Sequence, residues 1–497
     1  MRPDRVNGYL PVPASGGSPR KNPVPVSQLI SEVALQSYLD SLSDANQAFA
    51  AARPGPRTDR QPVHTVYGGA QLFKADLAQK MGRVALRVMD TFAPDYITFA
   101  HAFHLPGYEE LPTSGRERES LLAAPPSADT NRAAWLASAV YERVLEKLRR
   151  EPVEDFRIDF EDGFGVRPVE EERAEAARAA GEVAKAMELG VLPPFIGIRI
   201  KPLNDEYAAR SLGTLNRFFS ALLEQTGGQL PQPIFVTLPK ITHEDQVSVC
   251  GDALSQIEEA AGLPQDSIGL EFMVETATSI LGQDGHAMLP AWVKAARGRC
   301  TAAHFGVYDY TAGMDITATH QTMGHPACDF ARHVMQVSLA GTGVWLSDGA
   351  TNIMPVAPHR GEHLTPEQKA ANTGSVHRAW RLGFDDNMHS LRNAFYQGWD
   401  LHPAQLPARY AAVYTFFLDG YEAAAERLRS FVDKAAQASL VGDVFDDAAT
   451  GQGLLNYFLR ALNCGAITPE EAARTGLSLD EIRLRSFGRI LAQRAGS

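Results

Sequence analysis

Between about residues 60 and 405 the chain alternates short apolar runs with longer segments of helical periodicity. This alternation is typical of strand–helix units, which build parallel sheets covered by helices. Most of the apolar runs are rich in Val, Ile, Leu and Phe without strict polar alternation, as expected for strands buried on both faces. Eight runs are candidate strands: Val63–Tyr67, Phe156–Phe160, Phe195–Ile200, Ile234–Leu238, Gly269–Val274, Ala302–Val307, Gly343–Leu346 and Gly398–Leu401.

Eight strand–helix units predict an α/β fold of the (β/α)₈ TIM-barrel type over residues 61–405, although a doubly wound open sheet gives a similar pattern. A long insertion, at about 71–155, follows the first strand. Apolar residues at three- and four-residue spacing in Ala75–Met89 and Asn131–Arg150 predict that this insertion is helical.

The two ends of the chain lie outside the predicted barrel. Residues 1–60 are expected to form an N-terminal tail and a helix. Residues 406–497 are expected to form a helical C-terminal or lid region with a turn at Leu440–Asp447. Thr468–Glu471 is a capping-box pattern with Pro469 at the first helical position, and it predicts the start of a helix.

Charge and composition exclude several classes of protein. The net charge is −12 and the basic residues form no long run, which argues against nucleic-acid and membrane partners. No stretch approaches the roughly 18 apolar residues of a membrane span. Segment 1–26 lacks the apolar core of a signal peptide. The cysteines are widely spaced and suit free thiols in the cytoplasm, where we expect the protein to reside: Cys250, Cys300, Cys328 and Cys464.

Polar residues recur where the predicted strands end, and active sites of barrel enzymes lie at the C-terminal ends of the strands. A purely structural barrel does not need a ring of acids with one arginine inside it. The residues at these exits are Asp159–Gly163, Arg199, Pro239-Lys240, Glu275-Thr276, Gly306–Asp309, Asp348 and His402-Pro403.

Glu275 and Asp309 end adjacent strands, so their carboxylates can converge on one cation. Two carboxylates completed by water and chelating substrate oxygens are the usual way in which Mg²⁺ is held. Either acid alone could instead cap a helix or lie in its first turn. The pair predicts a metal site.

Arg199 lies in the apolar strand Phe195–Ile200, where a guanidinium needs an anionic partner. It could pair with Asp159 or Glu161, or it could stabilise an oxyanion that develops on a substrate carbonyl. We expect Glu161 and Asp162 to orient metal-bound water or Arg199.

Lys240 could contact a substrate carboxylate or an internal carboxylate, and the sequence favours neither. A Schiff base is a lesser alternative, because no second lysine lies nearby in the sequence to lower the pKa of Lys240. Thr276, Gly306 and Val307, at the same strand exits, are expected to line the substrate site. The histidines have no zinc-binding spacing and are expected to be structural or capping residues.

Seven pieces in order resemble the superfamily of the citrate lyase β-subunit, the HpcH/HpaI aldolases and malyl-CoA lyase, over roughly residues 150–460. Each piece alone means little, but their order and their positions at predicted strand exits are specific. They are Asp159–Asp162, Arg199, Pro239-Lys240, Glu275–Ala277, Gly306–Tyr310, Trp399–Gln405 and Phe445–Thr450.

The resemblance assigns a cofactor and roles. It implies that Glu275 and Asp309 hold Mg²⁺ (or Mn²⁺), and that Arg199 is the family's arginine. It identifies Glu161 and Asp162 with the acids of the family's second-strand motif.

The resemblance also implies an acid/base group and partners. The family's lid aspartate matches Asp447, with Asp446 as the alternative. A small carboxylic acid or a CoA thioester is the implied substrate, and a homotrimer or homohexamer the implied assembly. The chain departs from the family in its greater length and in its first strand, which reads His64–Gly69 in place of an apolar start.

The expected function is that of a metal-dependent carbon–carbon lyase. Such an enzyme cleaves or forms a 2-oxo acid or a 3-hydroxyacyl-CoA through a stabilised enolate. A condensing enzyme like malate synthase, or an acyl-CoA thioesterase, is an alternative with similar chemistry. A non-catalytic barrel subunit is the alternative from another class, and it would not need both Glu275 and Asp309.

Overall fold

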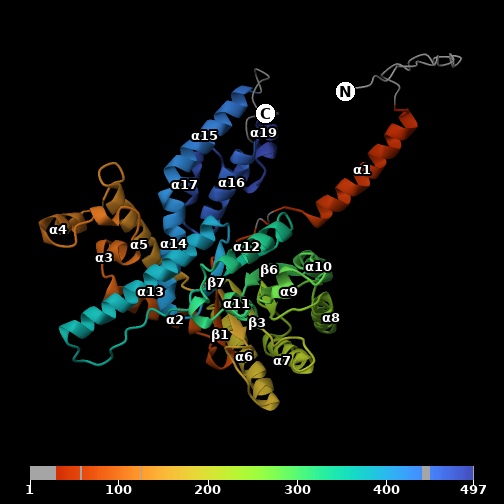
Figure 1. Cartoon of the computed structure of the whole chain (residues 1–497), viewed down its shortest axis with the longest axis horizontal. Helices are drawn as coiled ribbons and strands as arrows, with labels where there is room; N and C mark the ends of the chain where they lie inside the picture. The colour runs from red at the N-terminus through yellow and green to blue at the C-terminus, as the bar shows by residue number, and fades with distance from the viewer. Residues whose placement is uncertain (1–29, 56, 58, 125, 439–447, 496–497) are drawn as a thin grey trace, which may run out of the picture. The chain divides into compact units, whose positions relative to one another are not determined.

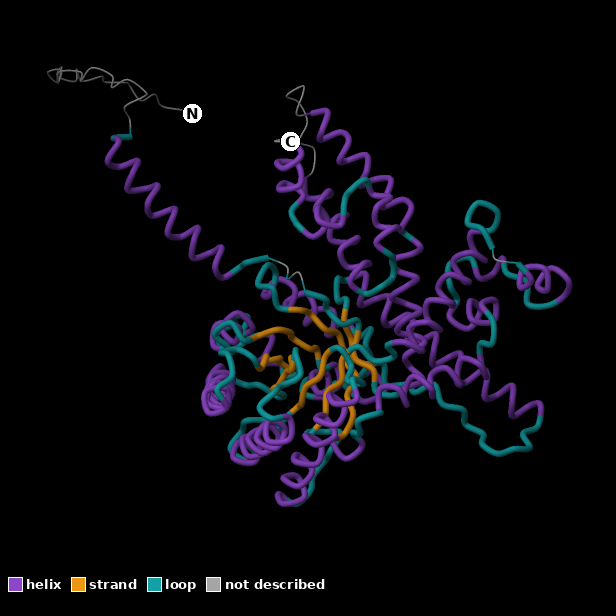
Figure 2. Tube along the Cα trace, turned by 180° about the vertical axis from the view of Figure 1, so that it is seen from behind, coloured by secondary structure: helices purple, strands orange, loops and turns teal. Residues whose placement is uncertain are grey.

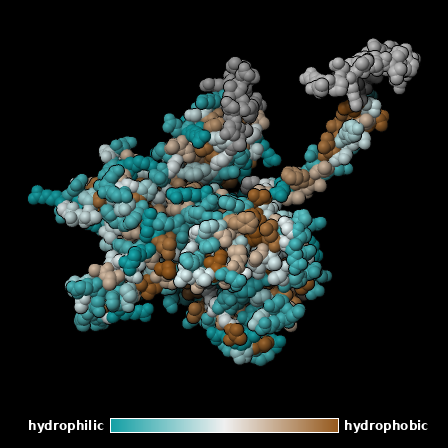
Figure 3. All heavy atoms as spheres, in the orientation of Figure 1, coloured by the Kyte–Doolittle hydropathy of each residue, from teal (hydrophilic) through white to brown (hydrophobic). Residues whose placement is uncertain are grey.

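The computed structural model describes residues 30–55, 57, 59–124, 126–438 and 448–495. The chain divides into two compact units, Met1–Pro54 and Gly55–Ser497. In the first unit the structure describes helix α1 (Glu32–Ala52), which has no buried residue and carries exposed apolar side chains such as Leu35 and Leu42. Figure 3 shows brown, apolar residues along this helix. The predicted division into domains stays a prediction.

The second unit is built on a closed barrel of eight parallel strands, drawn in orange in Figure 2. The strands follow one another in sequence order and β8 pairs with β1, so the predicted TIM barrel is confirmed. Every predicted strand overlaps an observed one. The strands are β1 (His64–Gly69), β2 (Asp155–Asp159), β3 (Phe195–Arg199), β4 (Ile234–Leu238), β5 (Ile268–Val274), β6 (Cys300–Phe305), β7 (Trp345–Ala350) and β8 (Gln397–Asp400).

Helices follow the strands of the barrel (Figure 1). Those after β2 to β6 are α6 (Val169–Leu189), α7 (Ala208–Thr226), α8 (Glu244–Ala261), α9 (Ala277–Ile280), α10 (Leu289–Ala295), α11 (Val307–Ala312) and α12 (Pro326–Leu339). Those after β7 and β8 are α13 (Pro366–Arg392) and α14 (Leu406–Asp419). Short 3₁₀ turns are η2 (Ala70–Leu72), η3 (Tyr108–Glu110), η4 (Ala318–His320), η5 (Pro403–Gln405) and η6 (Ala473–Thr475).

The insertion between β1 and β2 is helical, as its periodicity predicts: α2 (Leu77–Phe92), α3 (Tyr96–Phe103), α4 (Gly115–Ala123) and α5 (Arg132–Arg150). Helix α5 packs against both α3 and α14, which joins the insertion to the segment after the barrel. The stacked rings of Phe103 and Trp380 join α3 to α13. The insertion therefore shares one apolar core with the barrel helices.

The C-terminal region is helical where the structure describes it: α15 (Tyr421–Ala438), α16 (Ala448–Asn463), α17 (Pro469–Ala472), α18 (Leu479–Arg483) and α19 (Phe487–Ala495). The capping box of Thr468 and Glu471 forms as predicted at the start of α17. The predicted turn at Leu440–Asp447 lies outside the described residues. Among the described helices, none combines the length and the apolar character that a membrane crossing requires.

The barrel interior is layered because side chains alternate along each strand. At the N-terminal end of the strands, Phe195, Phe235 and Trp345 form an aromatic plug, with Phe195 stacked on Phe235 and edge-on to Trp345. This plug closes one end of the barrel. Polar side chains therefore gather in the middle and at the C-terminal end.

The middle layer is a buried ion network. Arg157 pairs with Asp155 at 2.7 Å and with Glu271, across the barrel, at 2.8 Å. Thr237 donates a hydrogen bond to Glu271, and His304 lies 3.2 Å from the same carboxylate. Burial raises the pKa of Glu271, but Arg157 and His304 outweigh it and hold that pKa at about 2. These contacts hold together the strands whose C-terminal ends carry the next layer of polar side chains.

Candidate active site

The C-terminal layer begins with a buried ion pair between β2 and β3. Asp159 and Arg199 are register partners, and both oxygens of Asp159 accept hydrogen bonds from Arg199, Nε at 2.7 Å and Nη2 at 2.5 Å. The ring of Tyr67 lies against the guanidinium, with its centroid 5.0 Å away. Burial alone would lower the pKa of Arg199, but Asp159 keeps it well above its usual value.

The loop after β2 carries two further acids, Glu161 and Asp162, and is held in place by hydrogen bonds to Asp159 and Lys201. The Asp159 carboxylate accepts backbone hydrogen bonds from Glu161 at 2.9 Å and from Gly163 at 2.7 Å. The buried Lys201 donates to the carbonyls of Phe160 at 2.8 Å and Gly165 at 3.2 Å. Glu161 Oε2 lies 3.4 Å from Arg199 Nη1. The loop is thereby fixed over the arginine.

Lys240 lies at the centre of the acids. Its ammonium forms a hydrogen bond with Glu161, and it lies 3.3 Å from Asp162 and 3.6 Å from Asp309. Its backbone N–H donates to Glu275 Oε1 at 2.7 Å. Lys240 has φ +48°, an uncommon value for a residue with a side chain. Of the two contacts left open by the sequence, the structure shows the one with internal carboxylates.

Glu275 follows β5 and is 2% exposed. Burial raises the pKa of Glu275 to about 8, although Lys240 and Arg199 act in the opposite direction. Asp309 and Glu161 raise that pKa further. Near neutral pH this carboxyl therefore lacks a sufficient counter-charge from the protein.

Gly306 gives the Glu275 side chain its room. A Cβ atom at Gly306 would lie 2.6 Å from Glu275 Cβ and 2.7 Å from Oε2. Asp309 stands one turn further on, in the first turn of α11, with its side chain 45% exposed. The glycine is thus required by the carboxylate beside it.

The donor set fits a hard divalent cation. Five carboxylates surround two cationic side chains, Arg199 and Lys240, so negative charge is in excess. The five are Asp159, Glu161, Asp162, Glu275 and Asp309. Within the described part of the chain, no group of three or more His, Cys, Asp or Glu side chains is placed so that it could hold a metal ion. Magnesium takes one or two protein carboxylates and fills the remaining positions with water and substrate, so this is compatible with the predicted pair.

Other predicted residues are bound up with the fold. The Thr276 hydroxyl donates to the carbonyl of Ile241 and accepts from Ser279 N–H as the cap of α9. Val307 is 1% exposed and lies in the apolar core, so the structure does not place it on an open surface of the site. Asp447 and Asp446 lie outside the described residues.

Two of the polar strand exits belong to the scaffold. Asp348 is buried in a pair with Arg332, at 2.9 Å, and accepts a hydrogen bond from Ser390. His402 accepts the N–H of Ala404 at the start of η5. Polar character at a strand exit therefore does not by itself mark the site.

Sequence reasoning did not single out Tyr67 and Lys201, which flank Arg199. Alternation along the strands was the available signal. Tyr67 on β1 pairs in register with Arg157, so alternation along the strand turns it inward. Lys201 lies two residues after Arg199, beyond the end of β3, and its ammonium contacts the carbonyls of Phe160 and Gly165.

Fold and site together define a TIM-barrel protein with an acid-rich polar centre at the C-terminal ends of its strands. The chain belongs to the family described as a domain of unknown function, DUF6986, whose model matches residues 42–490. Among curated proteins none matches the chain.

Solved structures similar to the chain include a citrate lyase from Burkholderia xenovorans LB400. It is 19% identical, the match covers 68% of this chain and 92% of that one, and the TM-score is 0.45. Haloferax volcanii malate synthase is also similar. Its magnesium/glyoxylate complex is 15% identical, with coverage of 75% and 94% and a TM-score of 0.40. Its pyruvate/acetyl-CoA ternary complex is 14% identical, with coverage of 73% and 94% and a TM-score of 0.39.

Proposed function

We propose that the chain is a metal-dependent enzyme that makes or breaks a carbon–carbon bond next to a carboxylate. The observation that carries this proposal is the excess of carboxylates around Lys240 and Arg199. Glu275 is buried with its pKa raised to about 8, and it keeps its proton near neutral pH unless a further cation arrives. Mg²⁺ or Mn²⁺ held by Glu275 and Asp309 would supply that cation.

The bound cation would act as a Lewis acid toward the carboxylate and the adjacent carbonyl or hydroxyl oxygen of a small acid. Arg199 has Nε and Nη2 committed to Asp159, and Nη1, which lies 3.4 Å from Glu161 Oε2, is the nitrogen that would also face substrate. That edge would bind the oxygen on which negative charge builds up as the carbon–carbon bond breaks. In the cleavage direction the substrate hydroxyl loses its proton to a base, and the electrons of the broken bond form an enolate.

The remaining roles follow the family resemblance. Asp447, or Asp446 beside it, would return a proton to the enolate carbon as general acid. Glu161 and Asp162 would orient water at the cation. A free 2-oxo acid or an acyl-CoA is the proposed substrate, a trimer or hexamer the proposed assembly, and the cytoplasm the proposed location.

The test is a panel assay on purified, metal-stripped protein. The panel holds malyl-CoA, citramalyl-CoA, acetyl-CoA with glyoxylate, and 4-hydroxy-2-oxo acids, each with and without Mg²⁺. Glu275→Gln, which keeps the size of the side chain and removes its charge, is the matched variant. Turnover that needs Mg²⁺ and is lost in Glu275→Gln supports the proposal, and the responding substrate separates the thioester class from the free-acid class. Turnover that ignores both metal and variant contradicts it.

A further inference from the structure

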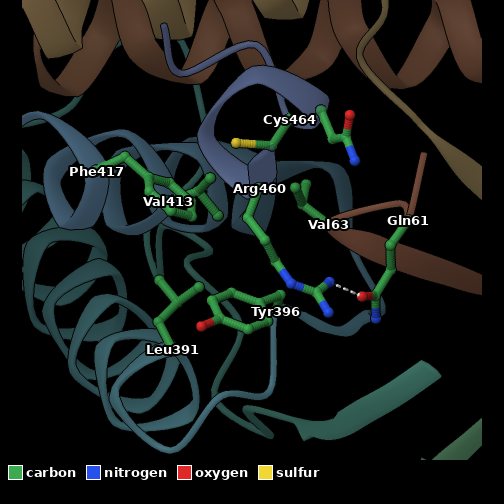
Figure 4. A pocket seen from close by; sticks show the side chains of 9 residues that line it. Gln61, Val63, Leu391, Tyr396, Val413, Phe417, Arg460 and Cys464 are labelled. Carbon is green, nitrogen blue, oxygen red and sulfur yellow. Dashed lines mark hydrogen bonds between the residues drawn. The ribbon is translucent and has the colours of Figure 1, made fainter. Parts of the chain in front are cut away.

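The pocket of Figure 4 lies near the beginnings of β1 and β8 and is too small for an organic ligand. Its cavity of about 20 Å³ has room for about one water molecule. Arg460 donates a hydrogen bond to Gln61 there, and its guanidinium lies 4.3 Å from the ring centroid of Tyr396. The side chains around this space therefore fill it themselves, whereas the apolar surface of helix α1 is open.

Helix α1 carries large apolar side chains and has no buried residue. The exposed fractions are 47% for Leu35, 58% for Tyr38, 57% for Leu42 and 65% for Phe49. A single helix of this length is only marginally stable in water, and most helices in proteins are stabilised by packing of an apolar face. The apolar face of α1 therefore needs a partner.

The apolar face is a narrow stripe. Its residues follow one another at spacings of three and four in turn, the repeat of a coiled-coil seam: Leu35, Tyr38, Leu42, Ala45, Phe49 and Ala52. On the polar face the side chains bond one another, since Gln36 donates to Asp40 at 2.7 Å and Gln47 to Ser43 at 3.2 Å. A narrow stripe of this kind suits one other helix, because packing on a domain core uses a wider apolar face.

The sizes of the stripe residues favour an identical helix that runs in the opposite direction. In an antiparallel pair Leu42 faces Ala45 of the second copy, Leu35 faces Ala52, and the rings of Tyr38 and Phe49 meet. Each large aliphatic side chain then lies against a small one, which fills the seam evenly. A parallel pair would place Ala45 on Ala45 and leave a gap.

The charges at the ends of α1 favour the same arrangement. Glu32 lies in the first turn, and Arg53 is the C-cap residue, with its guanidinium 5.9 Å from the ring centroid of Phe49. These two residues are three heptads apart and so flank the stripe on the same side. Antiparallel pairing brings Arg53 of each copy beside Glu32 of the other, whereas parallel pairing brings like charges together.

A membrane surface fits α1 less well than a second copy does. Interfacial helices are rich in Lys and Arg on the polar face, because these residues are attracted to anionic lipids. From Glu32 to Ala52 the charged residues of α1 are all acidic: Glu32, Asp40 and Asp44.

We propose that α1 pairs with α1 of a second copy of this chain as an antiparallel two-helix coiled coil. The six residues of the stripe form the seam, with Leu42 and Ala45 nearest its centre, and Glu32 and Arg53 pair at both ends. The pairing joins two copies through their N-terminal units and is independent of the chemistry at Glu275 and Asp309.

The experiment is sedimentation equilibrium of the full-length protein over a range of concentrations. Leu42→Glu places a charge in the seam. Val33→Glu is the matched control, because Val33 is an apolar residue of the same helix, 81% exposed, on the side away from the stripe. Neither substitution touches a buried side chain, so we expect both variants to unfold at the same temperature as the parent.

The parent and Val33→Glu should have twice the mass of Leu42→Glu. Equal masses for the parent and Leu42→Glu would overturn the proposal, as would dissociation of Val33→Glu to the same extent as Leu42→Glu.

Cysteine cross-linking tests the direction of the pair. Reduced Leu35→Cys and Ala52→Cys are mixed and then mildly oxidised, with each variant and the parent oxidised alone. We expect a disulfide-linked dimer from the mixture only, because two copies of residue 35 in an antiparallel pair lie about 25 Å apart. Cross-linking of Leu35→Cys with itself as readily as in the mixture would contradict the antiparallel arrangement.

Discussion

Lys240 contacts Glu275 through its main chain and the neighbouring acids through its side chain. Its N–H donates a 2.7 Å hydrogen bond to Glu275, and its ammonium lies among Glu161, Asp162 and Asp309. The same residue thus orients one candidate metal ligand and neutralises the charge around another. An ammonium ion and a divalent cation at this place serve the same carboxylates, so we expect them to compete.

Lys240→Met should therefore bind Mn²⁺ more tightly than the parent, by about tenfold, because a positive charge beside the site is removed. The backbone hydrogen bond to Glu275 stays in this variant. Without metal, the variant should be less stable, since the acids lose their cation, and Mn²⁺ should restore its stability. Titration calorimetry and thermal unfolding measure both effects. Lys294→Met, at an exposed position, is the control, and weaker Mn²⁺ binding in Lys240→Met would contradict the competition.

Arg199→Ala should lose turnover by on the order of a hundredfold or more, the effect of removing one well-aimed donor to a developing oxyanion. It should also lose about 3–5 kcal/mol of stability, because Asp159 is left buried without its partner. The double variant Asp159→Asn with Arg199→Met should regain much of the stability and none of the turnover. Urea unfolding and steady-state kinetics separate the two losses. Near-normal turnover in either variant would show that Arg199 serves only as a partner of Asp159.

Gly306→Ala should disturb the candidate metal site without a change of charge. The added Cβ would stand 2.6 Å from Glu275 Cβ, so the carboxylate must move. We expect at least tenfold weaker Mn²⁺ binding and about 1–3 kcal/mol lower stability, the usual effect of overpacking. Gly213→Ala, inside α7 with no atom near the new Cβ, should instead gain about 0.5–1 kcal/mol. Unchanged Mn²⁺ affinity in Gly306→Ala would mean that Glu275 is no ligand.

Asp386 should make the protein less stable as the pH rises. Burial raises the pKa of this carboxyl to about 6, and the hydrogen bond from Thr351 opposes the shift only in part. A carboxyl with a raised pKa holds its proton more tightly in the folded state. Its contribution is therefore complete below about pH 4 and is lost as the pH rises through 6, a change of about 3 kcal/mol.

The test is the free energy of unfolding between pH 4 and pH 8. Asp386→Asn should be more stable than the parent at pH 7.5 and should show a smaller decline over this range. Asp385→Asn, at the exposed neighbouring position, is the control. If the two variants have the same pH profile, the assignment to Asp386 is wrong.

The sequence predicts the barrel because its signal is repeated eight times. The order of strands and helices in a parallel barrel follows the chain, so eight correctly placed apolar runs fix the topology. The predicted strands differ from the observed ones mainly at their ends: Phe156–Phe160 is predicted, for example, and Asp155–Asp159 is observed. The helical insertion is equally visible, because α2 and α5 each turn one apolar face to the core.

The polar interior is less evident from the sequence. In β2 charged and apolar residues alternate strictly, Asp155-Phe156-Arg157-Ile158-Asp159, and this period of two places three charges inside the barrel. The pairing of Arg157 with Glu271 of β5 depends on barrel closure, which brings residues 114 positions apart together. The separation of the two residues along the sequence gives no indication of this contact.

Within the site, the residue types can be predicted from the sequence, but some of the contacts between them cannot. The sequence predicts that Glu275 and Asp309 lie at neighbouring strand ends, and it leaves open whether Lys240 faces substrate or internal acids. Two features of the folded chain decide where these side chains lie. One is the positive φ of Lys240, and the other is the space that Gly306 leaves for the Glu275 side chain.

The most direct measurement is an anomalous-difference map from crystals soaked in Mn²⁺, collected for the parent and for Glu275→Gln. We expect one strong peak in the parent, about 2.1 Å from carboxylate oxygens of Glu275 and Asp309, with the Lys240 ammonium moved away from it. The peak should be absent or much weaker in Glu275→Gln. A parent crystal without a peak there, with Lys240 still among the acids, would contradict the metal site and the function built on it.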